Sequence, residues 1–302
     1  MCKVEILEYK GLKNCIRLSD GEKELIAMTQ YGPRIIRYGF INGPNEFLEL
    51  ESDWNNLDTE EWQIFGGHRL WHSPESEARM APPDCYPVPY SLIENGFILE
   101  QNTEPHTLIQ KTMNVTMNSD GSVEVIHKLT NKGLWPVELA CWALSVMAAG
   151  GTEVVQYPNR ETDLLPNRTL TIWPYSNMSD PRINWGERYI FLRQMELGET
   201  KFKIGFPNEH GWAAYFNHNN LFIKKHVHVQ TDKYPDSNCS FETYTNEFML
   251  EVETLGPLVL LQPEESEEHY ERWELFKDIK CPIDETEMDK IKEIFGGAYE
   301  KA

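Results

Sequence analysis

The sequence predicts an all-β protein, a large antiparallel β-sandwich with a short C-terminal helix. Most of its 302 residues lie in short extended segments separated by turn residues, which is typical of a sandwich or barrel. Helical periodicity is scarce, and the absence of a repeat of about 20 to 50 residues argues against a propeller or solenoid. No linker is visible. Because sandwiches of this size occur as one unit, we expect residues 1–302 to form a single domain.

The predicted strands follow one another along the chain and should pair mainly as hairpins. In residues 121–129, alternating apolar side chains occupy one face of a strand, and residues 130–133 supply turn chemistry. The apolar run 137–149 is then expected to be the returning strand. The other expected strands are residues 24–29, 34–40, 97–101, 107–116, 189–192, 201–206, 212–217, 221–229 and 248–254.

One helix is predicted near the C-terminus. Asp284 can cap its first turn, and Glu287 follows three residues later as in a capping box. Apolar residues then recur on one face of residues 288–295, and Gly296 ends the pattern. We expect this helix to pack on the exterior of the sandwich.

The composition favours a well-packed acidic protein. Hydrophobic residues make up 40% of the chain and include nine Trp, 13 Tyr and 13 Phe, enough for a substantial core. The formal net charge of −20 opposes binding to nucleic acid and to anionic membrane surfaces, so neither is an expected partner. No signal peptide or apolar membrane span is visible, and we expect a cytoplasmic protein.

The six cysteines are scattered without a CxxC pair, which suggests neither a disulfide framework nor a zinc site. His68 and His72 have the spacing of helical zinc ligands, but neighbouring glycines and a proline argue against a helix there. His226 and His228 share one strand face and read as a solvated face rather than a metal site. We therefore predict no metal.

The densest functional signal is the segment Gly66–Glu75, which reads GGHRLWHSPE. It combines imidazole, guanidinium, indole and carboxylate groups in one turn-flanked stretch. An indole can stack on the apolar face of a sugar, while Arg and His groups hydrogen-bond its hydroxyls. In the purely structural alternative, Arg69 pairs with Glu75 and Trp71 fills the core. We favour a functional segment, because packing rarely needs so many different polar groups.

The second signal lies in residues 248–276, where Glu251 and Glu253 alternate with apolar residues on an expected buried strand. Burying a carboxylate is costly, so a glutamate in such a strand often has a partner or a catalytic task. In the alternative, this is an edge strand with its glutamates in water.

Leu250–Thr254, followed by a Leu-x-Pro-x-Glu-x-x-x-His pattern at Leu261–His269, resembles the C-terminal region of galactose mutarotases (aldose 1-epimerases). In that family the glutamate of the first motif is the general base, and it falls on Glu253 here. Pro263-Glu264 replaces the Pro-Gly of the family pattern.

Upstream, Tyr31–Ile35 resembles an early strand pair of the same superfamily, and Gly66–His68 resembles its Leu-His-Gly-Gly turn. The family's catalytic acid is a histidine in a region that Cys141–Leu144 occupies here, and no histidine stands there. The chain is most similar to a branch of mutarotase-like proteins that carries GGHRLWHxPE and the later segment at Tyr234–Asn246.

The resemblance implies a carbohydrate-binding isomerase of the aldose 1-epimerase type. Glu253 would remove the proton of the anomeric hydroxyl, and His68 or His72 would protonate the ring oxygen, so that the sugar ring opens and recloses. Carboxylate and imidazole groups, with ordinary pKa values of about 4.3 and 6.5, suffice without a cofactor. The expected substrate-binding residues are Arg34, Arg69, Trp71, Glu75, Trp142, Lys225 and Asp236.

Two alternatives stay open at this point. The chain is a sugar-binding protein without turnover, or it is a hydrolase or lyase acting on an acidic saccharide. The latter needs Glu253 opposed to Glu75 or Asp236 at about 5 to 9 Å. Basic residues near the expected pocket also suggest an anionic sugar as the small-molecule partner. A homo-oligomer is compatible with the sequence.

Overall fold

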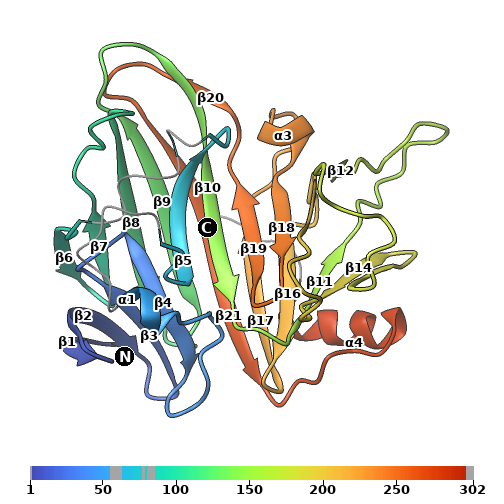
Figure 1. Cartoon of the computed structure of the whole chain (residues 1–302), viewed down its shortest axis with the longest axis horizontal. Coiled ribbons are helices and arrows are strands. Elements are labelled where there is room, and N and C mark those ends of the chain that lie inside the picture. The colour runs from blue at the N-terminus through green and yellow to red at the C-terminus, as the bar shows by residue number, and fades with distance from the viewer. Residues whose placement is uncertain (1, 55–62, 77–78, 80–85, 297–302) are drawn as a thin grey trace.

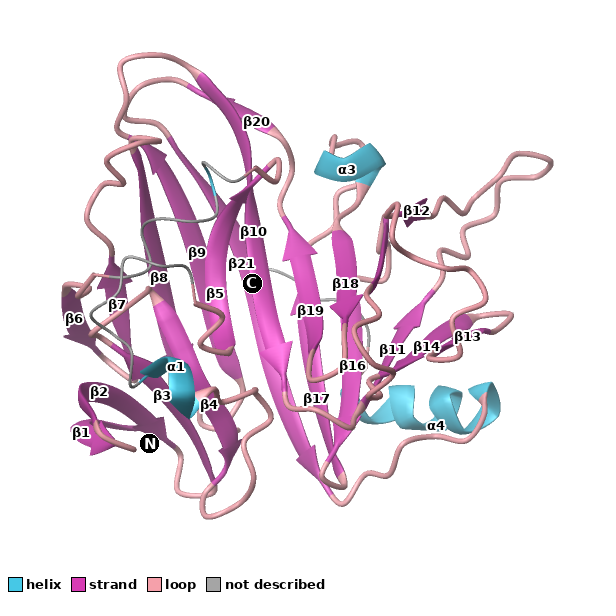
Figure 2. Ribbon diagram, viewed as in Figure 1, coloured by secondary structure: helices cyan, strands magenta, loops and turns pink. Residues whose placement is uncertain are grey.

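The computed structural model consists of two large antiparallel sheets packed face to face (Figure 1). It describes residues 2–54, 63–76, 79 and 86–296. One sheet has 11 strands and the other has 10. Helices are few and short, as the ribbon coloured by secondary structure shows (Figure 2). The predicted antiparallel β-sandwich with a short C-terminal helix is confirmed.

The first sheet carries the segments that the sequence marked as functional. Its central strands run side by side through the middle of Figure 1. In spatial order its strands are β1 (Lys3–Tyr9), β2 (Leu12–Ser19), β3 (Lys23–Met28), β4 (Arg34–Phe40), β5 (Gly67–Ser73), β10 (Val137–Met147), β19 (Leu250–Leu255), β18 (Phe241–Thr245), β15 (Phe202–Phe206) and β12 (Thr171–Ile172), with β20 (Val259–Leu261) paired to β10.

The second sheet closes the other side of the sandwich. In spatial order its strands are β13 (Ile183–Trp185), β14 (Tyr189–Arg193), β11 (Thr152–Gln156), β16 (Trp212–Asn217), β17 (Asn220–His226), β21 (Ser266–Lys277), β9 (Val123–Asn131), β8 (Ile109–Met117), β7 (Gly96–Glu100) and β6 (Tyr90–Ile93). The main hydrophobic core lies between the two sheets and takes Leu70 of β5, Val252 of β19 and Trp273 of β21.

Two glycines make the entry to β5 possible. Gly66 and Gly67 have φ values of 77° and 71°, in the region that L side chains rarely adopt. A Cβ on Gly66 would come within 2.0 Å of the Leu48 carbonyl oxygen, and one on Gly67 within 2.3 Å of the Ile35 carbonyl oxygen. The chain can therefore pass close to its neighbours and enter β5 as a fully buried strand.

Three helices complete the described chain: α1 (Glu51–Trp54), α3 (Pro235–Asn238) and α4 (Glu285–Phe295). The C-terminal helix α4 begins where the sequence predicted, with Asp284 accepting a hydrogen bond from the Glu287 N–H. Its buried Met288 packs with Trp212, outside the main core, so the helix covers the outer face of the second sheet. No helix of the described residues is long and apolar enough to cross a membrane.

Replacing the helix cap should weaken the fold only modestly. We expect Asp284→Ala to lower the free energy of unfolding by about 1 kcal/mol, because the Glu287 N–H loses its partner. Lys290→Ala, an exposed change inside α4, is the matched control and should stay within about 0.5 kcal/mol of the parent. Urea unfolding measures both, and equal losses in the two variants would contradict a capping role.

A buried carboxyl group between the sheets should make stability depend on pH. Neither carboxyl oxygen of Glu153 has a hydrogen-bond partner among the described residues, and burial raises its pKa from 4.5 to about 8. A raised folded-state pKa stabilises at low pH, and this contribution is lost as the pH rises toward 8. Relative to the parent, Glu153→Gln should therefore gain about 2 kcal/mol of unfolding free energy between pH 6 and 8. Urea unfolding of both proteins at several pH values measures this. A difference in unfolding free energy between parent and variant that stays constant from pH 6 to 8 would contradict the prediction.

Candidate functional site

A cleft with a volume of about 390 Å³ opens on the face of the first sheet that points away from the sandwich core. Its walls come from β5, β10, β15, β18 and β19 and from adjoining loops. Aromatic and charged side chains dominate its lining: Arg69, Trp71, Glu75, Trp142, Tyr175, Lys201, Lys203, Tyr244, Glu247 and Glu251.

Strand alternation and register bring these side chains together. Leu70 of β5 joins the main core, so its neighbours Arg69 and Trp71 point to the opposite face, into the cleft. On β10, Trp142 lies opposite Trp71 and Leu144 lies opposite Arg69. Residues paired across a sheet share a face.

The same register places Glu253 on the cleft face of the sheet, at a floor beneath the lining side chains and not among them. Glu253 pairs with Leu144 on one side and with Glu242 on the other. Its Oε2 accepts a hydrogen bond from the Trp142 indole N–H at 2.7 Å and contacts the Lys203 Nζ at 3.0 Å. Its Oε1 has no hydrogen-bond partner among the described residues. Glu253 is therefore held in one orientation with one acceptor oxygen to spare.

Lys203 of β15 is the central cation of this floor. Besides Glu253, its Nζ contacts a carboxylate oxygen of Glu242 at 2.8 Å. The ammonium also lies 4.8 Å from the ring centroid of Trp142 and 4.8 Å from that of Trp173. Burial disfavours the charged amine, but Glu253 and Glu242 together raise the pKa of Lys203 well above its ordinary value.

The carboxyl groups around Glu253 hold their protons unusually well. Burial raises the pKa of Glu242 to about 8; nearby Lys203 lowers it, and Glu253 raises it further. Burial likewise raises the pKa of Glu251 to about 7, against the lowering effect of Arg69. At the mouth, burial also raises the pKa of Glu75. The cleft thus contains carboxyl groups that can donate a proton near neutral pH.

A second ion pair and two indoles in edge-to-face contact also line the cleft. Arg69 donates a hydrogen bond to Glu251 at 3.0 Å, and its guanidinium lies 4.0 Å from the ring centroid of Trp71. The rings of Trp71 and Trp142 are 5.4 Å apart in an edge-to-face arrangement. The Trp71 indole N–H and the Arg69 Nε lack hydrogen-bond partners in the described chain. Such groups are rare in native interiors and are common where a ligand completes the network.

The chain matches solved structures across nearly its whole length, although no family model and no curated protein sequence matches it. A proposed aldose 1-epimerase from Klebsiella pneumoniae superposes with a TM-score of 0.56 at 10% identity, covering 97% of this chain and 86% of the other. A galactose mutarotase-like protein from Clostridium acetobutylicum superposes with a TM-score of 0.54 at 11% identity, covering 91% of this chain and 99% of the other. A proposed aldose 1-epimerase from Escherichia coli has a TM-score of 0.52 at 12% identity, covering 91% of this chain and 99% of the other. The chain has the galactose mutarotase-like fold.

Within this mutarotase-like fold, His68 and His72 do not face the cleft, contrary to the sequence-based expectation. Both alternate with Arg69 and Trp71 along β5, so they point into the sandwich interior. His72 bonds Glu104 at 3.1 Å, which is itself paired with Lys111. His68 contacts His127 at 2.7 Å. Neither imidazole can act with Glu253 on one sugar, because the sheet separates them.

Two other expected contacts also lie elsewhere in the fold. Arg34 is buried and donates to the carbonyl oxygens of Ile64 and Gly66, so it supports the chain that leads into β5. Lys225 lies on the second sheet, where its Nζ bonds the Phe295 carbonyl oxygen at 2.6 Å. Both side chains bond backbone carbonyl oxygens and neither lines the cleft, which corrects their assignment as substrate-binding residues.

Asp236 occupies an intermediate position. It lies in the short α3 segment and does not line the cleft. Its charge is nonetheless close enough to raise the pKa of Glu75 and of Glu242. Of the expected site residues, the structure therefore brings together Glu253 with Arg69, Trp71, Glu75 and Trp142, and leaves Asp236 beside them.

Sequence reasoning missed the residues that β15 and β18 supply. Lys203 stands in the apolar run FKIGF, where a single lysine in a buried strand is a signal comparable to a buried glutamate. Glu242 and Tyr244 stand in the segment FETYT, which carried the resemblance but received no role. Only the pairing of β15 with β18 and of β18 with β19 shows that these side chains surround Glu253.

Proposed function

We propose that this cleft binds a sugar and that the protein is an isomerase of the aldose 1-epimerase type with Glu253 as its base. The observation that carries the proposal is the setting of Glu253. It is oriented by Trp142 and Lys203 and keeps one oxygen without a partner among the described residues. It lies beneath a cleft lined by Glu75 and Glu251, whose pKa values are raised. The fold shared with proposed aldose 1-epimerases supports the same reading.

In the proposed reaction Glu253 accepts the proton of the anomeric hydroxyl, while an acid gives a proton to the ring oxygen. The bond between C1 and the ring oxygen breaks as the C1 carbonyl forms. Rotation about the C1–C2 bond and reversal of both proton transfers give the other anomer. The acid proposed here is Glu75, because it lines the cleft and partial loss of contact with water there raises its pKa.

The remaining cleft residues fit sugar recognition. Trp71 and Trp142 offer indole surface for the apolar face of a pyranose, and Arg69 with Glu251 offers a donor and an acceptor for neighbouring hydroxyls. Both buried cations of the cleft already contact glutamate side chains, Arg69 that of Glu251 and Lys203 those of Glu242 and Glu253. This pairing favours a neutral sugar over the anionic one suggested by the basic residues of the sequence.

One observation favours the second candidate function, sugar binding without turnover. Glu253 is 0% exposed, and its Oε2 accepts hydrogen bonds from both Trp142 and Lys203. A base so covered reaches the substrate only if Trp142 or Lys203 moves when the sugar binds. If neither side chain moves, the cleft binds sugar but leaves its anomers to interconvert at the uncatalysed rate.

Saturation-transfer NMR on a panel of neutral hexoses and hexose phosphates tests both candidates in the same samples. We expect faster exchange between the α and β anomers of at least one neutral hexose in the presence of the protein. Binding without faster exchange would leave the second candidate. Neither binding nor faster exchange with any sugar of the panel would contradict both.

A pair of tryptophan variants shows whether the cleft is the place of binding. Trp71→Ala removes an indole wall of the cleft and should abolish or strongly weaken sugar binding. Trp135→Ala is the control, because Trp135 is 79% exposed and does not line the cleft. Circular dichroism verifies that both variants fold. If the two variants bind the sugar with equal affinity, Trp71 is not part of the binding site.

A further inference from the structure

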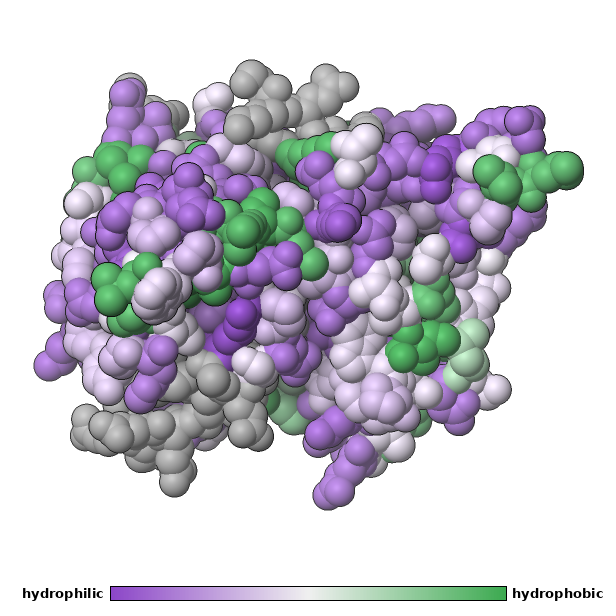
Figure 3. Space-filling model, turned by 90° about the horizontal axis from the view of Figure 1, so that it is seen from above, coloured by the Kyte–Doolittle hydropathy of each residue, from purple (hydrophilic) through white to green (hydrophobic). Residues whose placement is uncertain are grey.

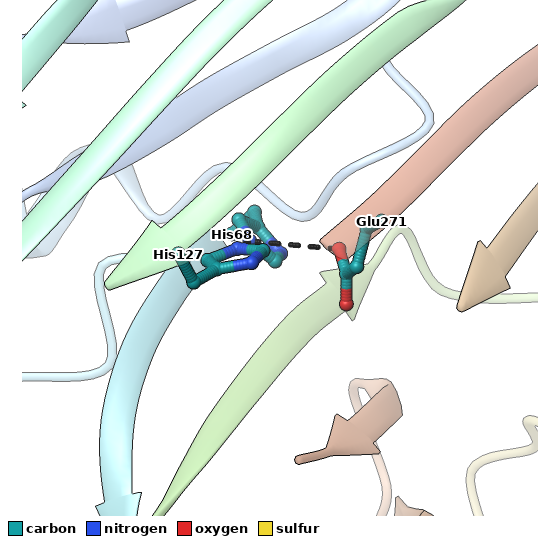
Figure 4. A group of neighbouring side chains, drawn as sticks. All are labelled: His68, His127 and Glu271. Carbon is teal, nitrogen blue, oxygen red and sulfur yellow. Dashed lines mark hydrogen bonds and ion pairs between the residues drawn. The ribbon is translucent and has the colours of Figure 1, made fainter. Parts of the chain in front are cut away.

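A polar cluster lies in the sandwich interior, on the opposite side of the first sheet from the cleft. His68 of β5, His127 of β9 and Glu271 of β21 belong to it, and each is at most 1% exposed. The three residues come from both sheets and meet at one point (Figure 4). The proposed sugar reaction uses none of them.

The three side chains converge as ligands of one ion would. His68 Nε2 is 2.7 Å from His127 Nε2 and 3.9 Å from Glu271 Oε2. One ligand atom from each residue lies within 4.8 Å of the other two. Zinc binds imidazole nitrogen and carboxylate oxygen at about 2.0–2.2 Å, so its ligand atoms stand roughly 3 to 3.5 Å apart. A small separation of the two imidazoles opens the required space.

Both imidazoles are held through their other ring nitrogen, and the Glu271 oxygen that faces them also accepts a hydrogen bond. His127 Nδ1 contacts the His269 carbonyl oxygen at 3.2 Å, and His68 Nδ1 contacts Ser145 Oγ at 2.9 Å. Glu271 Oε2 accepts from the Trp273 indole N–H at 2.8 Å. Metal-binding histidines usually donate their other ring N–H to a carbonyl or another acceptor, which fixes the ring and its tautomer.

Those contacts determine which ring nitrogen of each histidine carries the proton. His127 must donate through Nδ1 to the carbonyl, so its Nε2 is a lone pair and His68 Nε2–H donates to it. Moving the His68 proton to Nδ1, where Ser145 Oγ accepts it, frees both Nε2 atoms without loss of a proton. Burial lowers the pKa of His127 to about 3 and that of His68 well below its ordinary value, so both rings are neutral at pH 7.

The carboxylate uses its two oxygens separately. Glu271 Oε1 pairs with the Lys224 Nζ at 2.8 Å, while Oε2 points toward His68. The Lys224 Nζ also donates to the carbonyl oxygens of Ala143 and Val252, so the lysine is held at Oε1 and away from the two imidazoles.

We propose that His68, His127 and Glu271 bind one divalent transition-metal ion, zinc being the best match to two imidazoles and one carboxylate. The ion would join β5 of the first sheet to β9 and β21 of the second. Its role is structural, because the site is closed on all sides by the core and lies across the sheet from the cleft.

Elemental analysis of the full-length protein, purified without chelators from zinc-supplemented cells, tests this site. We expect about one zinc per chain in the parent and less than a tenth of that in His127→Gln. His226→Gln is the matched control, because His226 is equally buried in the same interior but is not a ligand, and it should keep the zinc of the parent. Circular dichroism verifies folding.

The parent alone can overturn the proposal. If it contains no stoichiometric metal, the full chain is unfolded in urea and refolded with zinc or cobalt before dialysis. Less than about a tenth of an equivalent of either metal after that step would exclude the site. Equal metal in the parent and in a folded His127→Gln would exclude these ligands. Neither result bears on the sugar cleft, because anomer exchange is measured separately.

Discussion

Replacing Lys203 by methionine is expected to lower the free energy of unfolding by about 3 to 5 kcal/mol, the loss typical of removing one partner of a buried ion pair. Lys203 is 4% exposed and is shared by Glu242 and Glu253. Without it, two neighbouring carboxyl groups remain buried with no cation between them. The loss should be larger at pH 8 than at pH 6, because protonation of the carboxyls relieves their repulsion. Urea unfolding at both pH values measures it.

Lys201→Met is the matched control for this change. Lys201 belongs to the same chain segment and lines the same cleft, but it is exposed. Its replacement should change the unfolding free energy by less than about 0.5 kcal/mol. A Lys203 variant as stable as the Lys201 variant would show that the floor of the cleft does not depend on this cation.

The second large effect is expected on catalysis. Glu253→Gln should reduce anomer exchange by about 10² to 10⁴-fold, the usual contribution of a general base. The glutamine carbonyl oxygen can still accept from the Trp142 indole and from Lys203, so the site keeps its shape while losing its basicity. Saturation-transfer NMR at several enzyme concentrations gives the rate for the parent and the variant.

Glu8→Gln controls for the loss of one negative charge, because Glu8 is exposed on β1, at the far edge of the same sheet. It should retain the exchange rate of the parent. If Glu253→Gln keeps sugar affinity and also keeps the full exchange rate, the base is another residue. Glu75→Gln would then be the next variant to measure, since Glu75 lines the same cleft.

The surface of the protein has the character expected of an acidic protein whose ligand binds in a cleft. The face seen from above is mostly hydrophilic, with separate hydrophobic patches (Figure 3). Leu134, Trp135 and Leu164 are among the apolar side chains left exposed. The net charge of −20 and the ion pairs of Arg69 and Lys203 agree with a cleft that takes an uncharged polar ligand.

The fold could be predicted from the sequence because apolar alternation marks strands locally. The predicted strands 34–40 and 212–217 coincide with β4 and β16. The strand β21 was missed because charged residues stand on both of its faces, Glu268 and Glu274 on the more exposed one and Glu271 on the buried one, so apolar alternation is weak. In β21 the alternate buried positions include His269 and Glu271, which gave no apolar signal.

The candidate site could be predicted only in part. The motif predicted Glu253, which lies beneath the cleft, and three other predicted residues, Arg69, Trp71 and Trp142, line it. The error over His68 and His72 has a simple cause. Their segment was interpreted as a turn-flanked stretch rather than as strand β5, so the alternation that separates them from Arg69 was not applied.

The remaining site residues depend on contacts between distant segments. Lys203 meets Glu253 only because β15 pairs with β18 and β18 pairs with β19. The interior cluster likewise forms across the two sheets, where His68 meets His127. A single sequence carries no local signal for such pairings, since strands far apart in the chain can be ordered in many ways.

The most direct test of the central claim is a crystal structure of the protein soaked with the sugar that binds best. We predict electron density for the sugar in the cleft, with a ring face against Trp71 or Trp142 and the anomeric hydroxyl within hydrogen-bond distance of Glu253. Density for the sugar at another site, with the cleft empty at a saturating sugar concentration, would contradict the account.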